Sequence, residues 1–357
     1  MRILHVITVA DLGGAQTVAA ELAARSAEGG DIVGLATSEE GPLWATLDPR
    51  IERFPIRGLA KALSPLDDLG SFLEIRRVMR SFRPDLVHLH SSKAGVLGRL
   101  AAWRLRPRTI YTVHGFDTIL KSHRAFLPLE RLLQYACGAV VAVSEYDRGN
   151  LEANGIRRNL VMARNGVRDW KDAEPGDAAA AAKMRRARSE GRPVALCVAR
   201  VAAPKRLDLF LKTAALLPEA AFFWIGNDAD PSANNIPPNV TFLGSLAGAG
   251  AYNNLADANL LLSDYEGLPM SVLEALSCGT PAVASAVGGI AEALDGACGI
   301  TVPNEAEAAS KALRSLLYGP GKERARSAAR ARYEADFSIG AMFRRYSELY
   351  SRLAETS

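Results

Sequence analysis

Short apolar runs alternate with stretches of helical periodicity along the whole chain. In the first half of the chain, the apolar runs predict buried parallel strands at Ile3–Val9, Asp31–Ala36, Leu86–Leu89, Thr109–Val113 and Ala139–Val143. The segments between them carry apolar residues at helical spacing and predict helices at Gln16–Ala27, Leu66–Phe82, Ala94–Leu105 and Leu127–Ala136. This alternation is typical of a doubly wound α/β domain.

The pattern breaks shortly after Asn165-Gly166, where a polar stretch, an alanine run and the basic segment Lys183–Arg192 carry no strand signal. A second series then predicts strands at Val194–Ala199, Ala221–Ile225, Val240–Leu243, Asn259–Leu262, Pro281–Ser285 and Gly299–Val302. Helical patterns at Leu207–Leu217 and Met270–Cys278 lie between these strands. We therefore expect two Rossmann-like domains, 1–168 and 193–336, joined by a linker at 169–192.

The last segment, Ile339–Leu353, carries apolar residues on one helical face, and this closing helix (337–357) must pack against another part of the protein. We expect the two domains to face each other across a cleft. Ligands of open α/β sheets bind beyond the carboxyl ends of the strands, so this cleft is the expected site.

Composition indicates a soluble globular protein, because apolar residues make up 48% of the chain and charged residues 23%. The N-terminal apolar run resembles a signal peptide, but His5 interrupts it and Asp11 follows. We interpret it as a buried first strand and expect a cytoplasmic protein. No apolar stretch approaches the roughly 18–20 residues of a membrane helix. The four cysteines form no CxxC pair, which favours reduced, buried thiols over a metal site.

The net charge of +4 is modest, but arginines concentrate on two predicted helices. One group is Arg76, Arg77, Arg80 and Arg83, and the other is Arg99, Arg104, Arg106 and Arg108. These residues form either a solvated face or a basic surface, with Trp103, that contacts anionic lipid headgroups or a phosphorylated acceptor. The second alternative predicts peripheral binding at the inner face of the membrane.

Two glutamates flank the start of a predicted helix in the second domain. Glu266 lies in a strand-to-helix loop, Pro269 suits the first helical turn, and Glu274 lies inside the helix Met270–Cys278. A helix start exposes unpaired N–H groups that bind a diphosphate, and nearby carboxylates accept hydrogen bonds from sugar hydroxyls. The alternative is a capping Glu and an ordinary helix Glu.

Two cations, Arg200 and Lys205, follow the strand Val194–Ala199 and are expected at the same sheet edge as Glu266. Together they are suited to bind a diphosphate and to stabilise its charge as it leaves. The alternative is a pair of ordinary surface cations.

In the first domain, Gly13-Gly14 joins the first strand to the first helix and permits close approach of the backbone to a ligand. The pattern is not GxGxxG, so a nicotinamide cofactor is not expected. His114 ends the strand Thr109–Val113 and is either structural or in contact with a ligand. Asp228 and Asp230 have the DxD form that binds a divalent metal ion in some enzymes, but their polar loop favours a turn with solvated carboxylates.

Taken together, these motifs resemble family 4 of the retaining GT-B glycosyltransferases. The stretch Glu266–Pro281 is similar to the E-x7-E signature of that family, and Gly288-Gly289 and Gly299–Pro303 continue the match. Upstream landmarks occur in the expected order: Gly13–Gln16, Val113–Gly115, Val143-Ser144, Asn165–Val167 and Arg200…Lys205. The resemblance covers nearly the whole chain and implies a GT-B fold.

The resemblance also implies the roles of the site residues. It makes Glu274 the ribose ligand and Glu266 a contact of the hexose hydroxyls, while Arg200 and Lys205 hold the diphosphate. It implies that His114 touches the transferring sugar. The donor-binding backbone would include Gly13, Gly14, Gly267, Leu268, Pro269, Met270 and Ser271. The implied reaction is front-face substitution with retention, in which the leaving phosphate oxygen takes the acceptor proton and neither metal nor cofactor is needed.

The resemblance further implies a nucleotide diphosphate sugar donor, with UDP as the expected nucleotide, and a closing helix that packs on the first domain. Many members have Gly-Phe-Gly where this chain has Gly267-Leu268-Pro269, so the resemblance does not determine which backbone groups contact the donor sugar. His90–Gly95 resembles a subgroup that builds bacterial surface polysaccharides, which suggests a saccharide acceptor linked to lipid. A non-catalytic two-lobed sugar- or nucleotide-binding protein and another GT-B enzyme, such as a nucleotide-sugar epimerase, remain alternatives.

Overall fold

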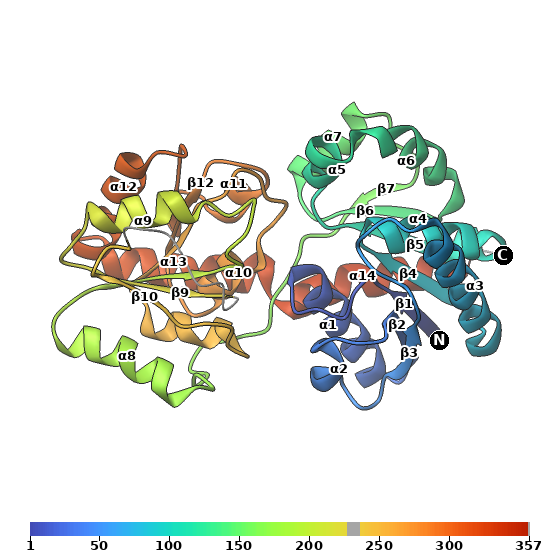
Figure 1. Ribbon diagram of the computed structural model, residues 1–357, viewed down its shortest axis with the longest axis horizontal. Coiled ribbons are helices and arrows are strands. Elements are labelled where there is room, and N and C mark those ends of the chain that lie inside the picture. The colour runs from blue at the N-terminus through green and yellow to red at the C-terminus, as the bar shows by residue number, and fades with distance from the viewer. Residues whose placement is uncertain (227–235, 356–357) are drawn as a thin grey trace. The chain divides into compact units, whose positions relative to one another are not determined.

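The computed structural model describes residues 1–226 and 236–355 (Figure 1). The chain forms two compact units, and each has its own parallel sheet with helices packed on it (Figure 1). Unit 1 comprises Met1–Asn165 and the C-terminal segment from Gly340, and unit 2 comprises Gly166–Ile339. No helix in the described ranges combines the length and the apolar character that crossing a bilayer requires.

The sheet of unit 1 has seven strands in the order β3-β2-β1-β4-β5-β6-β7. Its strands are β1 (Arg2–Val6), β2 (Ile32–Ser38), β3 (Glu52–Ile56), β4 (Leu86–His90), β5 (Thr109–Val113), β6 (Ala139–Ala142) and β7 (Leu160–Met162). Its helices are α1 (Gly14–Glu28), α2 (Leu43–Thr46), α3 (Pro65–Phe82), α4 (Ser92–Ala101), α5 (Asp117–Ser122), α6 (Leu127–Leu133), α7 (Glu145–Ala153) and α14 (Ile339–Ala354), with short helices η1 (Trp103–Arg108), η2 (Arg124–Phe126) and η3 (Gln134–Ala136). The central strands β4, β5 and β6 are buried along their whole length because helices cover both faces.

The sheet of unit 2 has six parallel strands in the order β10-β9-β8-β11-β12-β13. They are β8 (Val194–Val198), β9 (Ala221–Ile225), β10 (Val240–Phe242), β11 (Ala258–Leu261), β12 (Ala282–Ser285) and β13 (Gly299–Val302). The helices are α8 (Ala178–Ser189), α9 (Leu207–Ala215), α10 (Met270–Ser277), α11 (Ile290–Ala293), α12 (Ala306–Tyr318) and α13 (Lys322–Arg332), with η4 (Ala249–Leu255) and the π-helical turn η5 (Tyr333–Phe337). This is the doubly wound order, in which the chain reverses direction across the sheet after its third strand.

The apolar pattern predicted every strand of unit 2 to within a residue or two, but it missed β3 and β7 of unit 1. Both missed strands lie at the edges of the sheet. Strand β3 exposes most of its residues and contains Pro55, while β7 is short and only partly buried. Edge strands need less apolar surface, and proline is tolerated there, so their sequences do not read as strands.

The segment 169–192, expected to be a linker, contains helix α8, which belongs to unit 2. Asp177 caps this helix by accepting a hydrogen bond from the N–H of Ala180 at 2.8 Å. Met184 and neighbouring alanines on one face of α8 are buried against Val194 and Tyr252. Alanine and arginine runs gave this helix too little apolar periodicity to be recognised in the sequence.

The closing helix α14 packs on the sheet of unit 1 (Figure 1). The hydroxyl of Tyr350 lies 2.7 Å from Nδ1 of His88, and that of Tyr346 lies 3.1 Å from the Thr112 hydroxyl. Both tyrosines are fully buried. The last helix of the chain therefore completes the core of the unit that begins at residue 1.

Candidate functional site

The strand order of unit 2 reverses between β8 and β11, which lie side by side at the centre of the sheet. The loops that follow these strands leave the same carboxyl edge in opposite directions, and such a point is where doubly wound sheets bind ligands. The two loops hold each other. The N–H of Arg206 donates to Leu262 O at 2.9 Å, and the N–H of Asp264 donates to Pro204 O at 2.9 Å.

Lys205 and Glu266, one from each loop, form an ion pair at this switch point. Their side chains are only 18% and 11% exposed. A partly desolvated pair of this kind presents an ammonium group and a carboxylate with fixed positions to any ligand at the sheet edge. Arg200, predicted as the second cation, lies on the same loop with an exposed side chain. The structure thus brings Lys205 and Glu266 together and leaves Arg200 open to solvent.

A third loop, which follows β12, supports the backbone of Glu266. Gly288 adopts a φ of +59°, and a Cβ atom placed on it would lie 1.7 Å from Glu266 O. The next residue, Gly289, donates its N–H to Gly267 O at 2.8 Å. Only glycine fits at position 288, because both the positive φ and the close approach exclude a side chain.

Helix α10 starts directly after this loop. Pro269 is its N-cap and cannot provide a side-chain hydrogen bond, so the first N–H groups of the helix, at Met270 and Ser271, are left for water or a ligand. Leu268, in the loop before the helix, is buried. The predicted donor-binding backbone from Gly267 to Ser271 is thus a continuous turn into a helix N-terminus.

Glu274 lies on the second turn of α10. Burial raises the pKa of its carboxyl to about 7, and the positive charge of Arg168 opposes this shift. A carboxyl in such an environment gains from any hydroxyl or cation that donates to it. The sequence alone does not identify Arg168 as a site residue. It follows the Asn165–Val167 landmark but does not lie directly before a predicted helix or strand.

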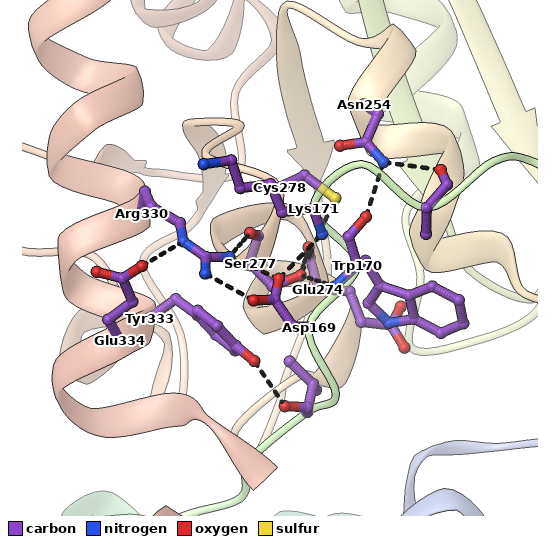
Figure 2. A network of polar contacts seen from close by, with 12 residues as sticks. Asp169, Trp170, Lys171, Asn254, Glu274, Ser277, Cys278, Arg330, Tyr333 and Glu334 are labelled. Atoms are coloured by element: carbon purple, nitrogen blue, oxygen red, sulfur yellow. Dashed lines mark hydrogen bonds and ion pairs between the residues drawn. The ribbon is translucent and has the colours of Figure 1, made fainter. Parts of the chain in front are cut away.

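A network of polar contacts holds the C-terminal end of α10 (Figure 2). The guanidinium group of Arg330 lies between Asp169 and Glu334 and also donates to Ser277 O. The Ser277 hydroxyl in turn donates to Glu274 O at 2.7 Å and accepts from the Trp170 N–H at 3.3 Å. The helix that carries Glu274 is therefore anchored to the segment that enters unit 2.

In unit 1, Gly13 is the N-cap of α1 and Gly14 is its first residue. Helix α1 has no side-chain cap and no acidic residue in its first turn. The first N–H groups of α1 therefore have no capping side chain as a partner, which suits them to an anion. A Cβ atom at Gly13 would meet only the flexible end of the Gln16 side chain, at 2.9 Å.

His114 follows β5 at the carboxyl edge of the same sheet, and its Nε2 lies 3.1 Å from Nδ1 of His90. Burial lowers the pKa of His114 to about 4, so the ring is neutral near pH 7. The next turn is fixed by Asp147, whose carboxylate accepts the Phe116 N–H at 2.8 Å and the Ser144 hydroxyl at 3.0 Å. The contact between His90 and His114 could not be predicted from the sequence, because His90 ends β4 and His114 follows β5.

The sequence predicts Arg99 at the surface, either on a solvated face or on a lipid-binding one, and the structure corrects both alternatives. Arg99 is 1% exposed, and its guanidinium group pairs with Glu130 at 2.7 Å and lies 4.2 Å from the centre of the Tyr111 ring. A buried, paired cation cannot bind lipid headgroups. Arg76, Arg77, Arg80 and Arg83 are exposed. The Asp228/Asp230 pair lies outside the described residues, and all four cysteines are free and buried.

The sequence matches two family models. The model of Glycosyltransferase Family 4 matches residues 12–170, and the model of Glycosyl transferases group 1 matches residues 192–318. Together they cover most of both units.

Named relatives are similar over most of their length. The chain is 26% identical to the UDP-Gal:alpha-D-GlcNAc-diphosphoundecaprenol alpha-1,3-galactosyltransferase of Escherichia coli, with 72% of each chain aligned. It is 27% identical to the O-antigen biosynthesis glycosyltransferase WbnH of Escherichia coli, over 82% of this chain and 83% of the relative. Among solved structures, HepE of Anabaena, crystallised with UDP and glucose, has a TM-score of 0.83 at 18% identity and covers 99% of this chain and 100% of its own.

Proposed function

Because this chain belongs to family 4 of the glycosyltransferases and has their GT-B fold, we propose that it moves a hexose from a UDP-sugar to a saccharide acceptor with retention of anomeric configuration. The observation that carries this proposal is the pairing of Lys205 with Glu266 beside the uncapped N-terminus of α10. That edge offers positive charge for a diphosphate and a carboxylate for sugar hydroxyls within one loop system. In this proposal unit 2 binds the nucleotide of the donor and unit 1 binds the acceptor.

Charge stabilisation of the leaving diphosphate is the central catalytic task. We assign it to Arg200, Lys205 and the N–H groups at the start of α10. Front-face substitution lets the leaving phosphate oxygen take the proton of the acceptor hydroxyl as the old glycosidic bond breaks and the new one forms. No protein base and no metal ion is required for this step.

The remaining residues orient the donor. Burial disfavours the ionised form of Glu274, and hydrogen bonds from the ribose hydroxyls would stabilise its carboxylate. Glu266 accepts from the hexose hydroxyls while its partner Lys205 reaches the phosphate. Within unit 1, we assign contact with the transferring sugar to His114, and close approach to the phosphates to the backbone at Gly13 and Gly14.

The relatives support a particular kind of donor and acceptor. The name of the galactosyltransferase of Escherichia coli states a UDP-galactose donor and an acceptor sugar on a diphosphoundecaprenol lipid. A second relative is named for O-antigen biosynthesis. We therefore propose a lipid-linked saccharide acceptor and a role in cell-surface polysaccharide or glycoconjugate synthesis, with the enzyme in the cytoplasm.

A lipid-linked acceptor requires access to the membrane, and helix α3 provides a suitable surface. Leu66, Leu69 and Leu73 recur at helical spacing on α3 and are 84%, 56% and 53% exposed. The exposed arginines Arg76, Arg77 and Arg80 continue the same helix. We define these six residues as the α3 surface. Exposed leucines beside arginines are suited to the headgroup region of an anionic bilayer, so we propose that this surface binds the inner face of the membrane.

Thermal stabilisation of the protein by a panel of UDP-, GDP- and ADP-sugars tests donor binding and identifies the nucleotide. The stabilising donor is then incubated with a polyprenyl diphosphate saccharide, and NMR of the product establishes the anomeric configuration of the new linkage. We expect a UDP-sugar to stabilise the protein and the product to keep the donor configuration. Donor binding without transfer would support a binding protein, and an altered free nucleotide-sugar would support an epimerase.

A further inference from the structure

Three histidines at neighbouring strands of unit 1 form a hydrogen-bonded row that ends at His114. His5 lies on β1, His90 lies at the end of β4 and His114 follows β5. Nδ1 of His5 is 3.2 Å from Nε2 of His90, and Nδ1 of His90 is 3.1 Å from Nε2 of His114. His5 and His90 are fully buried, and His114 is partly exposed. The row of histidines therefore runs from the core of the sheet to its carboxyl edge.

All three rings are neutral near pH 7. Burial lowers the pKa of His5 to about 3 and that of His114 to about 4. Burial also lowers the pKa of His90 well below its ordinary value, and the neighbouring His88, His114 and His5 add to this effect. Each ring consequently carries one N–H, and each N···N contact needs one donor and one acceptor.

Only two proton arrangements satisfy both contacts. In the first, His5 donates from Nδ1 to His90 and His90 donates from Nδ1 to His114, which leaves the proton of His114 on Nδ1. In the second, every donor is reversed, so that His114 donates from Nε2 and His5 must carry its proton on Nε2. His90 has a single N–H, so no mixed arrangement exists.

The surroundings of His5, at the buried end of the row of histidines, decide between the two proton arrangements. Nε2 of His5 is buried and has no hydrogen-bond partner in the described residues. The second arrangement would bury an unpaired N–H there, whereas the first leaves only an unpaired lone pair. Orphaned buried N–H groups are rarer than under-satisfied acceptors, so the first arrangement is the stable one.

We propose that His5 and His90 are positioning residues that hold His114 as a neutral imidazole with its proton on Nδ1, ready to donate to an oxygen of the bound donor. The Nδ1 atom makes no hydrogen bond to the described part of the chain and is the one ring nitrogen of His114 left for a ligand. The N–H of a neutral imidazole can donate a hydrogen bond to a sugar or phosphate oxygen on which negative charge develops. The role towards the donor rests on the proposed function, but the tautomer does not.

A buried metal ion is the alternative use of this cluster, since ligand atoms of His5, His88 and His90 lie within 4.8 Å of one another. However, both nitrogens of His88 are engaged at 2.7 Å, one with the Tyr350 hydroxyl and one with the Thr112 hydroxyl. His5 and His90 are engaged with each other. Metal binding would break these contacts, so the trio is better explained as a hydrogen-bonded network.

Long-range ¹H–¹⁵N NMR of the unliganded protein reads the tautomer of each histidine directly. We expect His114 to be protonated on Nδ1, with His123 as the internal reference for a solvent-exposed ring. His90→Asn places an amide N–H where Nδ1 was and should keep the His114 tautomer and most of the kcat. His90→Leu removes the donor and should return His114 to the Nε2–H form of free histidine, with kcat lowered by about tenfold or more.

His88→Gln is the matched control. It changes a neighbouring buried histidine that does not belong to the row, and it should leave the His114 tautomer unchanged. A wild-type His114 protonated on Nε2 would overturn the proposal, and this measurement does not depend on whether any variant folds. Stoichiometric zinc, nickel or cobalt in the purified protein would also overturn it. An Nδ1–H tautomer without sugar transfer would refute the proposed function alone, and transfer with an Nε2–H tautomer would refute this inference alone.

Discussion

The ammonium group of Lys205 and the carboxylate of Glu266 form an ion pair although they are 61 residues apart in the chain. Each follows a central strand of unit 2, and the adjacency of β8 and β11 brings them together. In the proposed mechanism the same pair binds both ends of the bond that breaks, with the lysine at the phosphate and the glutamate at the sugar.

Lys205→Ala should therefore lower kcat by about a hundredfold or more, because it removes a cation from the leaving diphosphate and leaves Glu266 without its partner. Steady-state kinetics with the stabilising donor measures this. Arg206→Ala is the control. Arg206 is the neighbour of Lys205, and its side chain pairs with Asp208 of α9 and with Asp264 rather than with Glu266, so we expect wild-type turnover. Arg200→Ala should lower kcat in the same direction. Wild-type turnover in both Lys205→Ala and Arg200→Ala would refute the assigned roles.

Gly288→Ala should abolish most of the activity, because its Cβ would collide with Glu266 O and displace the loop. Gly296→Ala is the matched control. Gly296 also has a positive φ, +82°, but no atom lies within 4 Å of the Cβ position, so it carries the backbone strain without the collision. A similar loss of kcat in both variants would show that strain, rather than displacement of Glu266, causes the effect.

Glu274 should make stability depend on pH. The ordinary pKa of a glutamate is near 4.5 and burial raises that of Glu274 to about 7, so the folded state holds a proton that the unfolded state has lost between these values. Stability from this group is present at acidic pH and is lost as pH rises towards 7. The difference in Tm between Glu274→Gln and wild type should therefore shift in favour of the variant by several degrees when pH is raised from 4.5 to 7. This shift corresponds to roughly one or two kcal/mol in the free energy of unfolding.

The same substitution should weaken donor binding, because an amide replaces the carboxylate that accepts from the ribose. Calorimetric titration with UDP measures this, and Glu274→Ala should weaken binding at least as much. Unchanged UDP affinity in Glu274→Ala would remove Glu274 from the donor site.

The α3 surface should bind vesicles that contain anionic lipid. Replacing Arg76, Arg77 and Arg80 by alanine should lower co-sedimentation by about tenfold or more, at about 1 kcal/mol for each cation near the bilayer. Leu69→Asp should lower it as well, since Leu69 would lose its apolar contact. Replacement of the exposed Lys183, Arg185 and Arg186 of α8 is the matched control and should have little effect. Equal binding to neutral and anionic vesicles would contradict the proposal.

Activity should survive EDTA, because Arg200, Lys205 and the start of α10 supply the positive charge that a metal supplies elsewhere. Turnover before and after dialysis against the chelator is the measurement. Strict dependence on manganese would instead direct attention to Asp228 and Asp230.

The local sequence was sufficient to predict a residue's position wherever that position depends only on the strand or helix to which the residue belongs. The apolar runs located every strand of unit 2, and parallel strands place the residue after each run at one sheet edge, so Arg200 and Lys205 could be assigned to the edge of Glu266. Local pattern failed at edges and in alanine-rich segments. Strands β3 and β7 and helix α8 bury too little apolar surface to show a period.

Contacts between strands depended on tertiary structure alone. The sequence determined that Lys205, Glu266 and His114 follow strands, since hydrophobic periodicity records which segments are buried. It did not determine the order of those strands in the sheet. That order pairs Lys205 with Glu266, connects His114 through His90 to His5, and buries Arg99 against Glu130. Burial and partners, and with them charge and protonation, are set by neighbours that lie far away in the chain.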